Sequence, residues 1–335
     1  AFEGLESFDF DSKILAGFER CRRDGCLLSD PDVYNENRRL LAGRFGFTVA
    51  FNNAHFANKR STSLHPEVAI DEAFDPAKFN FSKCKEVEKI HALTAAGCEH
   101  HILVNISPLM TGHCIVPLWC DAMLPQLLDA QGIRAAMDMC LQAGAGSNCR
   151  FGFNSLGAFA SVNHLHLHIL YPSRARARDD SCSNGFNGFP VESAAVKKMI
   201  TSGVTRLDWP LPCFSFTNRR LTGSIVEMFI EYLNEQRIPH SVLFIPGPQI
   251  RVIVAPRRPQ HAFDIQSAGF NAAVCEVFGL VIAHSQERFE SVSESLVVNA
   301  LATEAACEDV VMDRLELFLK HVSTSHGHPQ SHMPP

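Results

Sequence analysis

The sequence predicts an α+β protein made of two related halves, and three observations support this prediction. At 335 residues with 46% hydrophobic content, the chain is long enough for two domains or for one large duplicated domain. Residues 101–143 follow the pattern strand, turn, strand, helix, which is an α+β unit. A strand, turn and strand return at residues 240–256, an interval as long as that from 101 to 117.

Helical and strand patterns also precede the first unit. Residues 12–23 have the spacing of an amphipathic helix, and residues 43–53 have the aromatic and β-branched character of a strand. Residues 74–83 contain Pro76 and alternate polar side chains with phenylalanines, which predicts a short strand or a loop against the core rather than a helix.

The first unit is the clearest part of the chain. Residues 101–106 form a run typical of a buried strand, residues 107–112 predict a turn, and residues 113–117 predict a second strand. A helix of about 20 residues is predicted over 124–143. Residues 150–171 follow, and their last part alternates apolar and polar side chains as a strand does.

The second unit would lack the chemistry of the first. If residues 239–256 correspond to the earlier strand pair, Val252 stands in the place of His113, and the helical pattern predicted over 269–286 is followed by no histidine-rich strand. Only the first half is then equipped for catalysis. The predicted organisation is a catalytic half at 1–172, a flexible connection at 173–190, a degenerate half at 191–322 and a disordered tail at 323–335.

Composition limits the partners that we expect. The net charge of -6 and the pI near 6.2 provide no basic field for nucleic acid or for an anionic membrane, so a small phosphorylated ligand is favoured. The twelve cysteines contain no CxxC pair, and no apolar stretch approaches the length of a membrane span. We therefore expect a reduced, cytoplasmic protein, and the sequence does not predict its oligomeric state.

Three histidines alternate with apolar residues near the end of the first half. On a strand, His164, His166 and His168 would project to one face while the intervening leucines hold the strand on the core. A neutral imidazole can attack phosphorus and form a labile phosphoramidate. Exposed sheet histidines and a metal site remain as alternatives.

The residues just before these histidines favour a phosphate ligand over a metal. Gly157 allows close backbone approach, while Asn154, Ser155 and Ser161 offer hydrogen bonds, a combination that suits a phosphate cradle. No acidic residue lies between Asp138 and Asp179, which favours an anionic substrate over a cation. We expect no metal and no cofactor.

Basic side chains elsewhere are further candidates for binding phosphate. Lys59, Arg60 and Lys83 could pair with phosphate oxygens, and solvated surface charge is an equally good interpretation of all three.

The segment NSLGAFASVNHLHLHILY resembles the signature of the histidine-triad superfamily. Within that superfamily the chain resembles the GDP-hexose phosphorylases, a family that includes animal GDP-D-glucose and plant GDP-L-galactose phosphorylases. The resemblance rests on segments that occur in the same order, namely GRFGFTVAFN, which contains Asn52, FDPAKFNFSK, VNISPLMTGHCIVP with LPQ after it, FGFNSLGAFASVNHLHLH, FPVESA, and IRVIVAPR with FNAAVCE.

The resemblance implies a histidine-triad fold with an antiparallel sheet flanked by helices, and a two-step phosphorolysis. His166 would attack the α-phosphorus of a GDP-hexose, hexose 1-phosphate would leave, and inorganic phosphate would then release GDP. His164 and His168 would orient the nucleophile and donate to phosphate oxygens, and His113 matches a supporting histidine. Asn52, in one of these segments, joins the substrate-binding candidates.

The substrate is less firmly implied than the reaction. A histidine at position 168 favours the animal type and GDP-D-glucose, because plant members resemble HLHFQ there. The sequence departs from the family at Ala50–Asn52, where the family resembles QLN, and at Glu86–Lys89, where it resembles EVLF. The alternatives are GDP-L-galactose or another nucleotide sugar, a nucleotide hydrolase of the same superfamily, and a regulatory nucleotide-binding protein without turnover.

Overall fold

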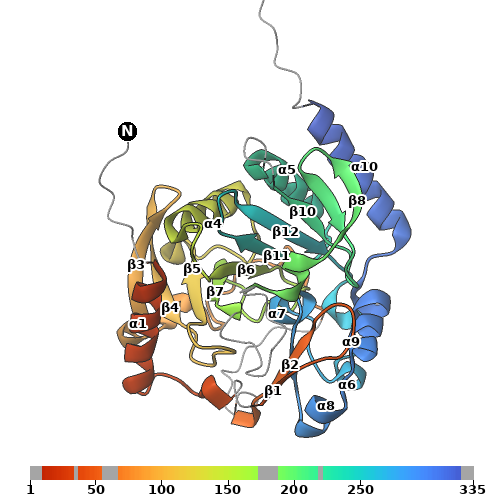
Figure 1. The fold of residues 1–335 in the computed structure, drawn as a ribbon. Helices are drawn as coiled ribbons and strands as arrows, with labels where there is room; N and C mark the ends of the chain where they lie inside the picture. Colours follow the sequence, from red (N-terminus) through yellow and green to blue (C-terminus); the bar gives the residue numbers. More distant parts are fainter. Residues whose placement is uncertain (1–9, 34–36, 55–66, 173–187, 218–221, 326–335) are drawn as a thin grey trace, which may run out of the picture.

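A ten-stranded antiparallel sheet forms the centre of the molecule in this computed structural model (Figure 1), which describes residues 10–33, 37–54, 67–172, 188–217 and 222–325. In spatial order its strands are β3 (Lys89–Ala95), β4 (Cys98–Val104), β5 (Cys114–Pro117), β7 (His166–Leu170), β6 (Arg150–Asn154), β11 (His240–Ile245), β12 (Arg251–Pro256), β10 (Phe214–Phe216), β9 (Val204–Leu207) and β8 (Val196–Thr201). The predicted α+β class with an antiparallel sheet is confirmed.

This strand order is symmetric about its centre. Three strands, a helix and two strands make each half of the sheet, with α4 (Ala130–Ala143) and α5 (Thr222–Glu235) inserted at the same point. The two halves meet where β6 pairs with β11, from Asn154 opposite Ser241 to Phe151 opposite Phe244. Strand β12 therefore occupies in the second half the place that β7 occupies in the first.

Apolar cores cover both faces of this sheet. One face packs against α1 (Phe10–Arg23), α4, α5 and α10 (Asp309–Ser325), which lie along the outside of the sheet in Figure 1. The other face packs against a smaller layer that contains α6 (Ile265–Ala268), α7 (Val274–Val277), α8 (Gln286–Ser291) and α9 (Glu294–Ala300). Because both faces are covered, β11 is buried throughout, with Val242 and Leu243 contributing to opposite cores.

A three-stranded sheet within that smaller layer joins distant parts of the chain. It consists of β1 (Arg38–Leu40), β2 (Thr48–Phe51) and β13 (Leu280–Ala283), with β13 parallel to β2. The Glu294 carboxylate accepts hydrogen bonds from the backbone amides of Arg44 and Phe45, which fixes the β1–β2 turn on α9.

Several predicted elements are shorter than expected. The helix predicted over 124–143 begins only at Ala130, because the Asp129 side chain accepts a hydrogen bond from the Gly132 amide and caps the helix there. The strand predicted over 43–53 is confined to β2. Residues 74–83 form turns and irregular chain that end in a single 3₁₀ turn, Phe81–Lys83, in agreement with the predicted loop.

Two predictions about the second half are wrong. Residues 269–286 contain only the one-turn helix α7 and then β13, because Gly279 at φ 116° turns the chain and the buried run Leu280–Ala283 joins β2. The proposed match of 240–256 to 101–117 also fails. Strands β11 and β12 correspond instead to β6 and β7, and the equivalents of β4 and β5 are β9 and β10.

Candidate active site

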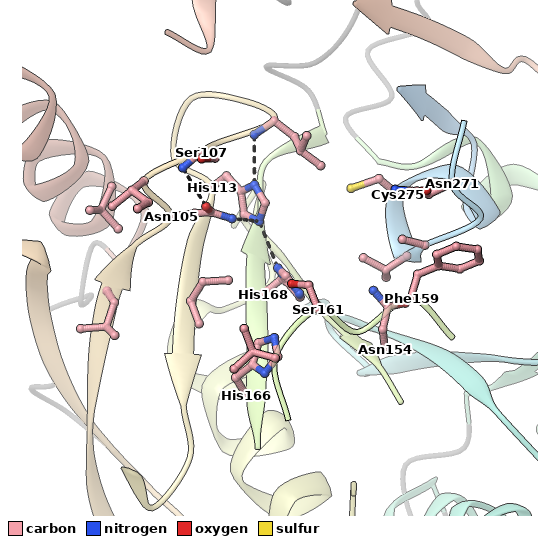
Figure 2. Close-up of a pocket in the computed structure, with 18 of the residues that line it drawn as sticks. Asn105, Ser107, His113, Asn154, Phe159, Ser161, His166, His168, Asn271 and Cys275 are labelled. Atoms are coloured by element: carbon pink, nitrogen blue, oxygen red, sulfur yellow. Dashed lines mark hydrogen bonds between the residues drawn. The ribbon is translucent and has the colours of Figure 1, made fainter. Parts of the chain in front are cut away.

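The histidines of β7 line a cavity on the face of the sheet opposite α4. His166, His168 and His113 all border it, while Leu167 and Ile169 point into the core on the helical side. Figure 2 shows the three imidazoles side by side, with Asn105 and Ser107 on one flank and Asn271 and Cys275 on the other. The cavity therefore lies between the two halves of the chain.

The His166 ring is held in one tautomer. Its Nδ1 lies 2.7 Å from the carbonyl oxygen of His164, and a carbonyl can only accept a hydrogen bond, so Nδ1 carries the proton. Nε2 then holds the lone pair at the cavity. The side chain is 3% exposed, and burial, with a smaller effect of His168, holds the pKa of His166 well below its usual value. At neutral pH this imidazole is uncharged, with the lone pair of Nε2 available.

Gln126 fixes the backbone of the same residue. Its Oε1 accepts a hydrogen bond from the His166 amide at 2.8 Å, and its Nε2 donates to the carbonyls of His166 at 3.2 Å and Asn154 at 2.9 Å. Gln126 has no exposed surface, and its own amide donates to Asn163 Oδ1 at 2.8 Å. The side chain thus fills the gap where β6 and β7 diverge.

His113 sets the tautomer of His168. The Leu109 amide donates to His113 Nδ1 at 3.1 Å, so the proton of a neutral His113 is on Nε2, which lies 3.1 Å from His168 Nδ1. His168 accordingly carries its proton on Nε2. Burial, with a smaller effect of His113, lowers the pKa of His168 to about 3, so the ring is a neutral N–H donor beside His166.

His164 lies outside this cavity. Strand β7 begins at His166, and the His164 ring uses Nδ1 to accept from the Phe81 amide at 3.1 Å and Nε2 to contact the Cys120 carbonyl at 3.1 Å. With both nitrogens engaged by backbone groups, the ring holds the Phe81 turn. The contribution of His164 to the site is its carbonyl oxygen, which orients His166.

Asn154 and Ser161 border the cavity as expected. Ser241 Oγ donates to Asn154 Oδ1 at 2.7 Å, so the amide nitrogen of Asn154 is turned to the cavity as a donor. Because Ser241 belongs to β11, the second half of the chain orients a side chain of the first.

The other predicted binding residues lie elsewhere or outside the described residues. Ser155 is fully buried, with its Oγ between the Leu156 carbonyl and the His240 amide. Gly157, at φ 73°, packs against Pro239. The nitrogen and the oxygen of the Asn52 side-chain amide both form hydrogen bonds with backbone groups of the chain. Lys83 Nζ donates to three loop carbonyls. Lys59 and Arg60 fall outside the described residues.

The sequence interpretation missed much of the cavity wall. The wall includes Glu88, Asn105, Ser107 and Phe159 from the first half of the chain, and four residues that follow β12 from the second half. These four are Asn271, Cys275, Glu276 and His284. For the residues after β12, the available signal was the FNAAVCE segment within the family resemblance, because no local pattern reveals that residues 271–284 return to β7. Asn105, Ser107 and Phe159 likewise lie in segments of that resemblance, VNISPLMTGHCIVP and FGFNSLGAFASVNHLHLH.

The described residues contain neither a group of side chains placed to bind a metal nor a helix suited to span a membrane. No group of three or more His, Cys, Asp or Glu side chains there is placed to hold a metal ion. Within the same part of the chain, no helix has the length and apolar character needed to cross a membrane.

Family models match both halves of the chain. The model described as "GDPGP1-like, N-terminal domain" matches residues 9–170, and "GDPGP1-like, C-terminal domain" matches residues 190–316. The chain belongs to the GDPGP1-like family. The resemblance to GDP-hexose phosphorylases is thereby confirmed.

Curated relatives of this GDPGP1-like chain carry two names. GDP-D-glucose phosphorylase 1 of Danio rerio is 27% identical over 309 residues, covering 86% of this chain and 84% of the relative. The Homo sapiens protein of that name is 29% identical over 290 residues, covering 78% and 70%. GDP-L-galactose phosphorylase 1 of Arabidopsis thaliana is 26% identical over 310 residues, covering 83% and 66%.

A solved structure shares the fold. Yeast Ap4A phosphorylase Apa2 in complex with Ap4A superposes with a TM-score of 0.58 at 14% identity, covering 90% of this chain and 99% of that chain. At this identity the likeness concerns the fold alone. It agrees with the histidine-triad-like α+β architecture expected from the sequence.

Proposed function

We propose that this GDPGP1-like protein is a GDP-D-glucose phosphorylase, which transfers GMP from GDP-D-glucose to inorganic phosphate through a guanylyl-histidine. The observation that carries the proposal is the neutral His166 ring, whose Nδ1 donates its proton in a hydrogen bond to the His164 carbonyl and whose Nε2 lies at a cavity. The names of the relatives support both the phosphorylase reaction and the sugar nucleotide.

In the first step, the Nε2 lone pair of His166 attacks the α-phosphorus and the bond to the bridging oxygen breaks. Hexose 1-phosphate leaves with the electron pair of that bond. The imidazole then carries a positive charge. The His164 carbonyl stabilises this charge by accepting the hydrogen bond from Nδ1, which lies 2.7 Å from the carbonyl oxygen. This carbonyl has a fixed position before the reaction begins, so its orientation costs nothing during the step.

Neutral donors complete the phosphate site. The His168 N–H and the Asn154 amide face the cavity, and each is oriented by a partner, His113 and Ser241 respectively. They can donate to the α-phosphate oxygens as charge builds on them. In the second step, inorganic phosphate attacks the guanylylated histidine, giving GDP and restoring the neutral ring.

A reduced cytoplasmic location is part of this proposal. All eleven cysteines within the described residues are free thiols, and six of them are buried. Inorganic phosphate and sugar nucleotides are the proposed small-molecule partners.

The decisive experiment follows the α-phosphate. GDP-glucose labelled there should transfer label to the protein when phosphate is absent, and addition of phosphate should discharge it as labelled GDP with formation of glucose 1-phosphate. The adduct should be labile to acid and stable to base, as a phosphoramidate is. It should map to residues 164–168 and be absent in His166→Asn, which should lose nearly all turnover while keeping the wild-type circular dichroism spectrum.

Each alternative gives a different outcome. A hydrolase would release GMP at the same rate with or without phosphate, and a regulatory protein would bind nucleotide with no turnover. Faster reaction with GDP-L-galactose than with GDP-glucose would assign the other hexose. Labelling of another peptide during measured turnover would remove His166 from the role of nucleophile.

A further inference from the structure

Helix α1 ends in a cap that brings two cysteines together. Gly25, at φ 71°, takes the left-handed conformation, and its amide donates to the Arg22 carbonyl at 3.1 Å. The Cys26 amide donates to the Cys21 carbonyl at 2.9 Å. These two hydrogen bonds form a Schellman motif, in which the side chains of the first and last residues commonly touch. In this chain those two residues are Cys21 and Cys26.

The two thiols contact each other and share one acceptor. The Cys26 thiol is within hydrogen-bonding reach of the Cys21 thiol. Cys21 Sγ donates to the Val87 carbonyl at 3.4 Å, and Cys26 Sγ donates to the same oxygen at 3.8 Å. A disulfide requires two side chains that point toward each other over a short distance, and the cap provides this arrangement in the reduced protein.

The two sulfurs differ in exposure. Cys26 is half-buried, whereas Cys21 has no exposed surface. A dissolved oxidant can therefore reach Cys26 first, and Cys21 is placed to attack the sulfur of an oxidised Cys26. Burial, with a smaller effect of Cys21, raises the pKa of Cys26. The thiol is therefore protonated at neutral pH and reacts slowly there, so it responds to a lasting excess of oxidant.

The shared acceptor belongs to a segment that borders the cavity. Val87 lies in the 3₁₀ turn Glu86–Glu88, directly before β3, which packs beside α1 in Figure 1. Glu88 of this turn lines the cavity that contains His166. A disulfide has no S–H group to donate, so oxidation removes both hydrogen bonds to the Val87 carbonyl.

We propose that Cys21 and Cys26 form a site of reversible oxidation, at which a disulfide oxidant such as oxidised glutathione links the two sulfurs and loosens the turn that carries Glu88. The Cys26 thiolate attacks one sulfur of the oxidant and expels a glutathione thiolate. The Cys21 thiolate then attacks Cys26 Sγ and expels the second. The protein loses two electrons and two protons, and the oxidant becomes two glutathione thiols.

The test treats the folded wild-type protein with oxidised glutathione at about pH 8.5, where more of each thiol is ionised. The protein is then transferred to denaturant that contains N-ethylmaleimide and is digested with trypsin. Trypsin cleaves after the arginines between the two cysteines, which therefore fall in separate peptides, 21–22 and 24–38. The disulfide should appear in mass spectra as these two peptides joined with the loss of two hydrogen atoms, and dithiothreitol should separate them.

Three cysteines provide the controls. Cys26→Ser keeps a polar side chain at the cap and removes one sulfur, so the joined peptides should disappear. Cys98→Ser is the matched control, because it removes the exposed thiol of the β3–β4 hairpin, and the joined peptides should form in it as in the wild-type protein. Cys114 is a buried thiol close enough to Cys21 to interact with it, and a link between those two would overturn the assignment.

Hydrogen exchange measures whether oxidation reaches the turn. Amides of residues 86–89 should exchange about fivefold faster in the oxidised protein, because two weak hydrogen bonds to this turn are lost. Exchange in α5 serves as the internal control and should not change. Failure of the link to form, or a link with no change of exchange in residues 86–89, would overturn the proposal. Neither measurement involves turnover, so the proposed function is tested separately.

Discussion

The direction in which the His166 ring faces is decided by backbone atoms rather than by neighbouring side chains. The His164 carbonyl selects the tautomer, and the amide and carbonyl of His166 itself are bound by Gln126. In many triads of this general kind a carboxylate orients the base. Here the orienting group is an uncharged carbonyl, and the buried His166 ring therefore remains neutral.

Gln126→Met should slow guanylylation of His166 because methionine keeps the volume of the side chain and removes all of its side-chain hydrogen bonds. We expect the rate constant of label transfer to fall about a hundredfold, as misplacement of a reacting group by about 1 Å does, with little change in KM. Rapid-quench measurement of the label with saturating GDP-glucose reports the rate constant.

The matched control for this variant is Gln142→Met, the same substitution on the exposed side of α4, which should leave the rate unchanged. A Gln126→Met protein with normal label transfer would show that the strand alone holds His166. A parallel rise in KM would mean that the cavity itself had collapsed.

The sequence predicted the central residues of the site but not its boundary. His166, His168, Asn154 and Ser161, which line the cavity, were identified because strand alternation and a phosphate-like composition are local properties, whereas His113 was identified through the family resemblance. Ser155 has the same chemistry as Ser161, and only the tertiary fold turns its hydroxyl toward the His240 amide instead of the cavity. Residues of the second-half wall are separated from β7 by about a hundred positions, which no periodicity can bridge.

At the scale of elements, the errors of prediction arose in short apolar runs. Leu280–Ala283 is apolar on both faces because β13 is buried against β2, and a run of that kind has no periodicity that separates helix from strand. The longer helices α1 and α4 were found because their apolar stripes repeat over several turns. The predicted helix wrongly included residues 124–129, because the apolar pattern continues through them although Asp129 caps the helix and makes it begin at Ala130.

Strand β11 should make the fold sensitive to acid through its first residue. His240 has no exposed surface, its Nδ1 lies 3.0 Å from the Ile238 carbonyl, and burial lowers its pKa to about 4. The unfolded chain takes up a proton near pH 6.5 whereas the folded chain does not. The stabilisation is therefore complete above pH 6.5 and is lost as the pH falls toward 4, by about 1.4 kcal/mol per pH unit.

This pH dependence is measured as the free energy of unfolding in urea between pH 7.5 and 4.5. His240→Asn keeps a donor for the Ile238 carbonyl and cannot be protonated, so its curve should be shallower than that of the wild-type protein below pH 6.5. Parallel curves for the two proteins would show that His240 is not responsible.

The whole molecule combines a symmetric sheet with an asymmetric site. Strand β12 (Arg251–Pro256), the counterpart of β7, contains no histidine, so one covalent site is expected for each chain. The second half contributes Ser241, which orients Asn154, and the part of the cavity wall at residues 271–284. The predicted boundaries at residues 172 and 190 stay a prediction, because the sheet is continuous from β6 to β11.

Removal of metal ions should leave the activity of the whole protein unchanged. The proposed reaction uses the His166 imidazole, the His168 donor and amide groups, and none of its steps requires a cation. Incubation with a strong chelator, followed by assay of phosphorolysis in metal-free buffer, tests this expectation, with a zinc-dependent enzyme treated in parallel as the control. Loss of activity that added zinc restores would return the histidines to the role of metal ligands.

The parallel pairing of β2 with β13 has a consequence for how the protein is made. Thr48–Phe51 lies more than 200 positions before its partner strand, so it emerges from the ribosome long before Leu280–Ala283 has been synthesised. Contacts this distant in sequence form slowly because a long loop must close first. Strand β7, which carries His166, is synthesised before β2 and β13 can pair. The cavity wall at residues 271–284 is synthesised together with β13. A newly made chain therefore contains His166 early and completes the wall of this cavity only after residues 271–284 have been synthesised.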